Sequence, residues 1–265
     1  MLKNITIGQY IPGDTPIHNM DPRVKILITI VLITILFFIA NFWGYAVYAA
    51  FLAMIIFISA IPFKLVLRGL KPLIIIILFT VVLNALMTQG QPIFTFWIFK
   101  VTKEGLILAG FMGLRLIFLI TGASILTLTT SPIALTDGIE KLLNPFKKIG
   151  VPAHELAMMM TIALRFIPTL LEETDKIMKA QMARGADFET GNIINRARAM
   201  VPLLVPLFIS AFRRADELAL AMEARCYRGG DNRTRMKQLK IKGVDYAGIA
   251  VTIIFCAAII GSRYI

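Results

Sequence analysis

Long apolar runs alternate with shorter polar connections along the first half of this chain, and one more apolar run lies near its end. At roughly 15 to 25 residues, each run approaches or exceeds the length that a helix needs to cross a bilayer. The third run is the shortest and is expected to draw on its flanks. The pattern predicts five transmembrane helices, at Val24–Ala40, Gly44–Ile61, Leu73–Met87, Leu106–Thr130 and Val244–Ile260.

The stretch between the fourth and fifth runs, residues 131–243, is much longer than an ordinary connection and is expected to carry its own structure. Ser131-Pro132 is typical of a helix start and predicts a short amphipathic helix over Ile133–Phe146. Two longer helical patterns follow it. One runs from Pro152 to about Arg184, and the other runs from Asn192, as its N-cap, to about Tyr227.

The two long helices are expected to lie along, or obliquely to, the cytoplasmic interface of the membrane. At 1.5 Å per residue they would extend about 48 Å and about 55 Å, whereas the hydrocarbon core is about 30 Å thick. Their charges flank apolar interiors, which Pro168, Pro202 and Pro206 are expected to bend or break. In the alternative interpretation, apolar middles such as Val201–Phe212 form short re-entrant or extra spans.

These elements divide the chain into four segments. They are a cytoplasmic N-terminal segment (1–23), a four-span region (24–130), a cytoplasmic helical region (131–243) and a final span (244–265). The first segment lacks the charged and then apolar design of a cleaved signal, so the first span is expected to be retained. A hydrophobic content of 57%, a charged content of 17% and a mean hydropathy of +0.76 agree with an all-α integral membrane protein.

The net charge of +12 is explained by membrane topology rather than by nucleic acid. Eighteen Lys and Arg residues fall between residues 131 and 242, and others flank the first span and the connection from the second span to the third. These segments share one side of the membrane if the N-terminus is cytoplasmic, as the positive-inside rule predicts. We therefore expect contact with anionic lipid headgroups and no nucleic-acid partner.

The sequence lacks the motifs of common catalytic and cofactor sites. It has no Gly-x-x-x-x-Gly-Lys-Ser/Thr loop, no His-Glu-x-x-His and no Gly-x-Ser-x-Gly elbow. Cys226 and Cys256 fall in the helical region and in the last span, so no disulfide is expected, and two histidines are too few for a metal site. The acidic cluster at residues 172–175 is interpreted as a solvated face that pairs with Lys176 and Lys179. We expect no catalytic residue, no bound cofactor and no metal.

Two polar residues inside the spans, and three consecutive methionines, invite a functional interpretation. Arg115 lies well inside the fourth span, where a cation is costly and is often functional; alternatively, it bonds within the bundle to Asn84 of the third span. Methionines such as Met158, Met159 and Met160 most often only fill gaps in a hydrophobic core. Methionine also re-packs around different partners, which would suit a surface that accepts more than one protein.

Two tripeptides, Ala183-Arg184-Gly185 and Ala224-Arg225-Cys226, end the two long helices. An aspartate (Asp175, Asp216) precedes each arginine at the same spacing, so the pattern is a repeat. A helix dipole and a left-handed cap would explain a single arginine followed by a small residue. Recurrence at two helix ends favours a docking element for two equivalent grooves, because small neighbours let each guanidinium reach carboxylates or carbonyl groups of a partner.

With these motifs, the chain resembles the transmembrane T component of energy-coupling factor (ECF) transporters over nearly its whole length. The segments Gly8–Gly13 and Met20–Lys25 also resemble the start of that family. The resemblance implies that the two long helices are coupling helices whose tripeptides dock into two ATP-binding-cassette ATPases, identical or paralogous. Asp175 and Asp216 would support the coupling. Cys226 departs from the family's glycine; it is small enough to keep the fit, but a strictly left-handed backbone is not expected there.

The resemblance further implies a non-catalytic subunit of an importer in a prokaryotic cell membrane. The partner ATPases would use ATP, and a small membrane-embedded S component, exchangeable with others at the Met158–Met160 surface, would bind a vitamin or micronutrient. One alternative is a dedicated subunit for cobalt or nickel uptake. Another is an autonomous secondary transporter or channel with Arg115 and Asn84 along its path.

Overall fold

The computed structural model describes residues 10–39, 41–96, 99–186, 188, 193–230 and 239–262. The chain forms two compact units, which we describe one at a time. The span unit takes in residues 8–138 and 238–265, and the crossed-helix unit is built from residues 139–237.

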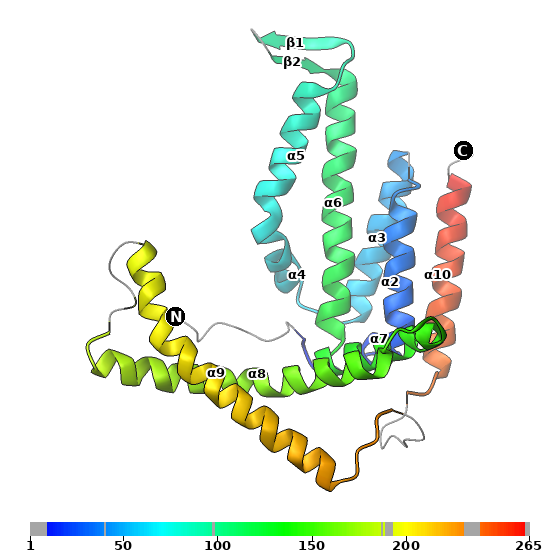
Figure 1. Cartoon of the computed structure of the whole chain (residues 1–265). Coiled ribbons are helices and arrows are strands. Elements are labelled where there is room, and N and C mark those ends of the chain that lie inside the picture. The colour runs from blue at the N-terminus through cyan, green and yellow to red at the C-terminus, as the bar shows by residue number, and fades with distance from the viewer. Residues whose placement is uncertain are drawn as a thin grey trace. The chain divides into compact units, whose positions relative to one another are not determined.

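The span unit consists of helices that follow the predicted apolar runs closely. In Figure 1, α2, α3, α6 and α10 stand together, and α5 lies beside α6. Its helices are α1 (Pro16–Asn19), α2 (Pro22–Leu36), α3 (Phe42–Ile58), α4 (Phe63–Leu70), the 3-10 turn η2 (Lys71–Leu73), α5 (Ile74–Met87), α6 (Lys103–Thr129) and α10 (Gly243–Ser262).

The connections before and after α5 contain secondary structure of their own. The third run draws on its N-terminal flank, as predicted, since residues 63–87 form one helical stretch of 25 residues. Between α5 and α6 lies an antiparallel hairpin of β1 (Pro92–Phe96) and β2 (Phe99–Thr102), which the hydropathy pattern did not predict. The alternation of aromatic and β-branched residues with polar ones in this segment is typical of such strands.

Aromatic packing holds α3 against its neighbours in the span unit. Tyr48 is fully buried, and its hydroxyl donates to the carbonyl of Leu32 in α2 at 3.2 Å. Phe51 stacks on Phe255 of α10, with ring centroids 3.9 Å apart. Inside a bilayer, such close contacts and internal hydrogen bonds provide the cohesion that water cannot drive.

A polar cluster ties the two ends of the span unit together. Asp21 caps α2, and its backbone N–H donates to the buried carboxylate of Asp245 in α10 at 2.7 Å. The Arg23 guanidinium donates to Asp21 at 2.7 Å and thereby lowers the pKa of that carboxyl. Lys25 is buried too, and its Nζ donates to the carbonyls of His18 and Thr129, both at 3.0 Å. The start of α2 is therefore fixed to α6 and α10.

The crossed-helix unit carries two helices of more than 30 residues. They are α8 (Ala153–Ala183) and α9 (Ile193–Ala224); α7 (Pro132–Leu143) and the 3-10 turn η3 (Asn144–Ile149) precede them. Ser131 caps α7 as predicted, since its Oγ accepts from the N–H of Ala134 at 3.3 Å. The expected N-cap of α9, Asn192, lies outside the described residues.

The prolines do not break these helices. Pro168 lies inside α8, and Pro202 and Pro206 lie inside α9, yet each helix runs through them. Of the two outcomes that we expected, a bend or a break, the break is therefore wrong, and the bend stays a prediction. A proline φ fits the helical backbone, and the lost hydrogen bond is local, so many flanking turns keep a long helix intact.

Four described helices are long and apolar enough to cross a membrane, which confirms an all-α integral membrane protein. They comprise residues 63–87, 103–129, 153–183 and 243–261, and α3 is a shorter apolar helix. The third of these is α8. Its length and composition thus fit an extra span as well as the interfacial helix that we predicted.

Candidate docking site

The two arginine tripeptides form the same structure at two helix ends. Arg184 follows the last residue of α8 and Gly185 has a φ of 88°; Arg225 follows the last residue of α9 and Cys226 has a φ of 54°. Both arginines and their small neighbours are exposed. Each end therefore presents a cation beside a backbone that turns sharply away from the helix.

The capping hydrogen bonds correspond one to one between the two ends. At the first end, Gly185 N–H donates to Met182 O and Ala186 N–H donates to Gln181 O, both at 3.0 Å. At the second end, the equivalent bonds run from Cys226 to Glu223 at 2.8 Å and from Tyr227 to Met222 at 3.0 Å. Both are Schellman caps.

The left-handed backbone at Cys226 corrects the expectation from its residue type. A side chain at positive φ is disfavoured by roughly 1–2 kcal/mol, because Cβ approaches the backbone carbonyl. The two paired hydrogen bonds of the cap offset this penalty. The second end consequently keeps the geometry of the glycine-capped first end, and both present the arginine in the same way.

A charged contact joins α8 and α9 where they cross. Glu173 of α8 accepts hydrogen bonds from Ser210 and Arg214 of α9, the latter at 2.9 Å. Figure 1 shows α9 crossing α8, with their C-terminal ends on opposite sides of the crossing. Glu173 precedes Arg184 by the same number of residues as Arg214 precedes Arg225.

This contact joins equivalent positions of the two repeats. Glu173 and Arg214 have the same separation in the sequence as the two docking arginines, so they occupy equivalent positions of the repeat and pair with each other. At 1.5 Å per residue, each docking arginine lies about 16 Å from the crossing along its helix. The two arginines thus lie at equal distances along their helices from the Glu173–Arg214 contact.

The role of Glu173 was missed in the sequence. We interpreted the acidic cluster as a face that pairs with Lys176 and Lys179 on its own helix; Glu173 does interact electrostatically with Lys176, but it also accepts hydrogen bonds from α9. One signal was present: residues of opposite charge stand at equivalent positions of the repeat. Near a two-fold axis such positions face each other, so complementary charges are favoured there.

A histidine contacts the residue that caps the second arginine end, within the same unit. His154 Nδ1 lies 3.0 Å from Oε1 of Glu140, and its Nε2 lies 3.2 Å from the Tyr227 hydroxyl. Tyr227 completes the cap of Arg225. A Cβ added to Gly230 would lie 2.5 Å from Cδ2 of His154, so the chain after the cap also packs closely on this ring. No sequence signal pointed to this histidine as a docking support.

The remaining predicted residues of the crossed-helix unit are accessible to different degrees. Met159 and Met160 are 55% and 37% exposed, whereas Met158 is half-buried. Asp175 is half-buried and Asp216 is exposed, so the two aspartates that recur before the arginines differ in surroundings. Their supporting role stays a prediction.

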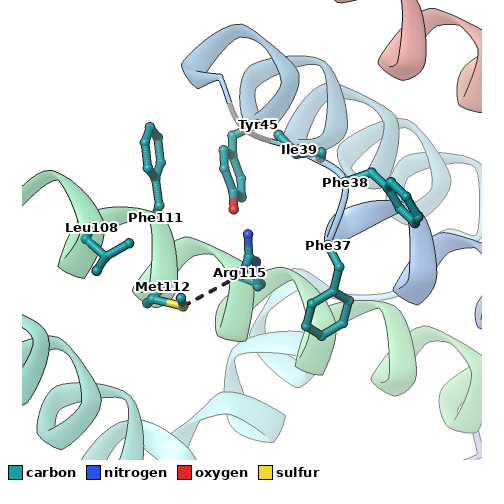
Figure 2. Close-up of a pocket in the computed structure, with 8 residues that line it drawn as sticks. All are labelled: Phe37, Phe38, Ile39, Tyr45, Leu108, Phe111, Met112 and Arg115. Carbon is teal, nitrogen blue, oxygen red and sulfur yellow. Dashed lines mark hydrogen bonds between the residues drawn. The ribbon is translucent and has the colours of Figure 1, made fainter. Parts of the chain in front are cut away.

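Arg115 and Asn84 do not pair, which overturns the bonding that we considered. Asn84 Nδ2 donates to the carbonyl of Thr80 on its own helix at 2.8 Å. Arg115 lies over the ring of Phe37, 5.3 Å from its centroid, and its Nη1 is 3.8 Å from the sulfur of Met112 (Figure 2). A side-chain amide within reach of the i−4 carbonyl satisfies itself locally, and this possibility is invisible in the spacing of two spans.

The described residues contain no cluster of three or more His, Cys, Asp and Glu side chains placed to hold a metal ion. The crossed-helix unit presents two exposed arginines at matched helix ends of a contacting pair of helices. Together with the helices that are long and apolar enough to cross a bilayer, this arrangement defines an integral membrane protein with two matched cationic helix ends.

Comparisons with known proteins give the particular family. A model of the cobalt transport protein CbiQ family matches residues 13–236. The chain is 62% identical to the energy-coupling factor transporter transmembrane protein EcfT of Thermosediminibacter oceani over 264 residues, covering 100% of both chains. The proteins of that name from Clostridium kluyveri and Bacillus subtilis are 61% and 49% identical, over 98% of this chain. The chain belongs to this family, the EcfT transmembrane components of ECF transporters.

Proposed function

We propose that this subunit couples two ATPases to a substrate-binding membrane protein, with the helix ends at Arg184 and Arg225 as the ATPase docking elements. The observation that carries the proposal is the match between the two ends. They share the same cap hydrogen bonds, a left-handed residue after each arginine, and equal distances from the Glu173–Arg214 contact. Two equivalent ends suit two related ATPases, identical or paralogous.

In the proposed mechanism, ATP is bound and hydrolysed only by the partners, and the chain binds no cofactor. Each exposed guanidinium forks onto carboxylates or carbonyl groups in a groove of one ATPase. When the ATPases move, they displace the ends of α8 and α9, and the Glu173–Arg214 contact makes the helices pivot rather than separate. The exposed Met159 and Met160 surface would transmit this movement to an exchangeable S component for vitamin or micronutrient uptake.

The proposal places the N-terminus and the crossed-helix unit in the cytoplasm of a prokaryotic cell, where the ATPases work. The concentration of Lys and Arg between residues 131 and 242 supports this orientation.

Arginine substitutions test the docking. In Arg184→Ala and Arg225→Ala, co-purification of the ATPases in mild detergent is expected to weaken, and the double variant is expected to lose both the ATPases and ATP-dependent uptake. Arg213→Ala is the matched control, because Arg213 is an exposed arginine of α9 away from the helix end. Full assembly and uptake in the double variant would overturn the proposal.

A second candidate is a subunit dedicated to cobalt or nickel uptake. It is favoured by the description of the matching family as a cobalt transport protein. Uptake of radiolabelled cobalt and nickel by cells that express the assembled complex separates the two. Metal uptake that depends on Arg184 and Arg225 would support the second candidate, whereas vitamin uptake without metal uptake would support the first.

A further inference from the structure

A polar pocket in the span unit has no role in the proposed coupling. It has a volume of about 350 Å³ and lies between the end of α2, the start of α3 and the middle of α6. Figure 2 shows its lining, with the Tyr45 hydroxyl directed toward the Arg115 guanidinium. The eight lining residues are Phe37, Phe38, Ile39, Tyr45, Leu108, Phe111, Met112 and Arg115.

Two buried polar groups in this pocket lack hydrogen-bond partners within the described residues. They are Nε of Arg115 and the hydroxyl of Tyr45, a residue that is only 2% exposed. The contacts of Arg115 are the face of Phe37 and the weak acceptor sulfur of Met112. A buried donor without an acceptor is costly, and a cation in an apolar wall is more so, which points to a ligand that supplies acceptors and negative charge.

The lining also restricts the kind of anion. Among the eight lining residues none is acidic, so the pocket offers no carboxylate to pair with a positive group of a ligand. Phe37 and Phe38 are 57% and 55% exposed and form apolar walls that face the surroundings of the bundle. The chemistry thus fits a ligand with an anionic head and an apolar tail.

The depth of the pocket suits a lipid headgroup. At 1.5 Å per residue, Arg115 lies about 21 Å before Thr129 along α6. The carbonyl of Thr129 accepts from Lys25 near the start of α2. With the level of Lys25 at one face of a hydrocarbon core about 30 Å thick, the backbone of Arg115 lies about 10 Å from the other face. A long arginine side chain and local thinning of the bilayer bridge such a distance.

We propose that the Arg115–Tyr45 pocket binds an anionic phospholipid at the end of the span unit where α2 leads into α3. Arg115 forks onto the phosphodiester oxygens, and Tyr45 donates a further hydrogen bond. The acyl chain lies along Phe37 and Phe38. Zwitterionic lipids bind less well, because their ammonium group finds no acidic partner in the lining.

Native mass spectrometry of the delipidated full chain in mild detergent tests the site, with phosphatidylglycerol and phosphatidylcholine added separately. Retention of phosphatidylglycerol is expected to fall at least tenfold in Arg115→Gln, and less in Tyr45→Phe. Arg115→Lys keeps the charge without the fork, and an intermediate loss is expected. The exposed residues Arg68 and Tyr246 provide matched controls, since Arg68→Gln and Tyr246→Phe are expected to behave as the unchanged chain.

Several results would overturn the proposal. They are equal retention by Arg115→Gln and the unchanged chain, or equal retention of the two lipids. Displacement of phosphatidylglycerol by equimolar glycerol 1-phosphate would make the pocket a site for free phosphate. Cross-linking of the pocket to an acidic residue of a co-purified membrane protein would make it a protein contact. If Arg115→Gln does not fold, Arg115→Lys and Tyr45→Phe decide the outcome by the same comparison.

Discussion

The backbone at positions 185 and 226 gives opposite predictions for two reciprocal substitutions. Gly185→Ala adds a Cβ at a φ of 88°, and Cys226→Gly removes one at a φ of 54°. A non-glycine residue in the left-handed region loses roughly 1–2 kcal/mol. A non-glycine residue also restricts the unfolded backbone more than glycine does, which favours the folded state by roughly 0.4–1 kcal/mol and partly offsets that penalty. The net change is about 0.5–1 kcal/mol, unfavourable at position 185 and favourable at position 226.

Hydrogen exchange measures this local free energy directly. The amides of Ala186 and Tyr227 donate the outer hydrogen bonds of the two caps, so they exchange only when the cap opens. We expect the Ala186 amide to exchange about twofold to fivefold faster in Gly185→Ala, and the Tyr227 amide to exchange slower by a similar factor in Cys226→Gly. Binding of the ATPases should accordingly weaken in Gly185→Ala and strengthen in Cys226→Gly.

A control isolates the backbone conformation from the added atom. Gly243 has ordinary φ and, like Gly185, has no neighbouring atom within 4 Å of the place that a Cβ would take, so Gly243→Ala adds the same group without the strain. If Gly185→Ala and Gly243→Ala have the same effect on their local amides, or if Cys226→Gly speeds exchange at Tyr227, the left-handed backbone does not control the stability of the caps.

Three further predictions concern stability, measured by thermal unfolding in detergent. In a double-mutant cycle of Glu173→Ala and Arg214→Ala, we expect a coupling of about 0.5–1 kcal/mol, because the pair is partly exposed; zero coupling would remove the proposed pivot. Gly230→Ala should lower the melting temperature, since its Cβ meets the His154 ring at 2.5 Å, and adding His154→Ala should relieve much of the added penalty. The lowered pKa of Asp21 means that its ion pair stabilises the fold above the ordinary carboxyl pKa of about 4, and that this contribution is lost as the pH falls through the lowered value. In Asp21→Asn, the melting temperature should therefore fall less steeply as the pH is lowered below about 4. An unchanged dependence of the melting temperature on acid pH would contradict this.

Much of the fold was predictable from local hydrophobicity. The apolar runs anticipated α2, α3, α5, α6 and α10 to within a few residues, because a segment in lipid must satisfy its backbone internally and therefore forms a helix. The Ser131 cap was predictable for a similar reason, since it depends on neighbours in the sequence. The hairpin between α5 and α6 was missed because a short apolar segment fits a strand or a helix end equally well.

The candidate docking site was only half visible. The repeat located Arg184 and Arg225, but residue type alone argued against a left-handed backbone at Cys226. That conformation results from the cooperation of two hydrogen bonds, which outweigh the preference of one residue. Similarly, Asn84 was a reasonable partner for Arg115 by its position in a neighbouring span, but its amide found a closer acceptor on its own helix.

The sequence by itself determined the membrane class, the approximate helices and the paired arginines, because each depends on patterns within a few turns of chain. Only the tertiary structure decided that Glu173 faces Arg214, that Arg184 and Arg225 are equally distant from this crossing, and that Tyr45 and Arg115 share a pocket. These relations join side chains of different helices that are far apart along the chain. Helix packing and hydrogen-bond geometry choose among many such pairings, and hydropathy does not distinguish them.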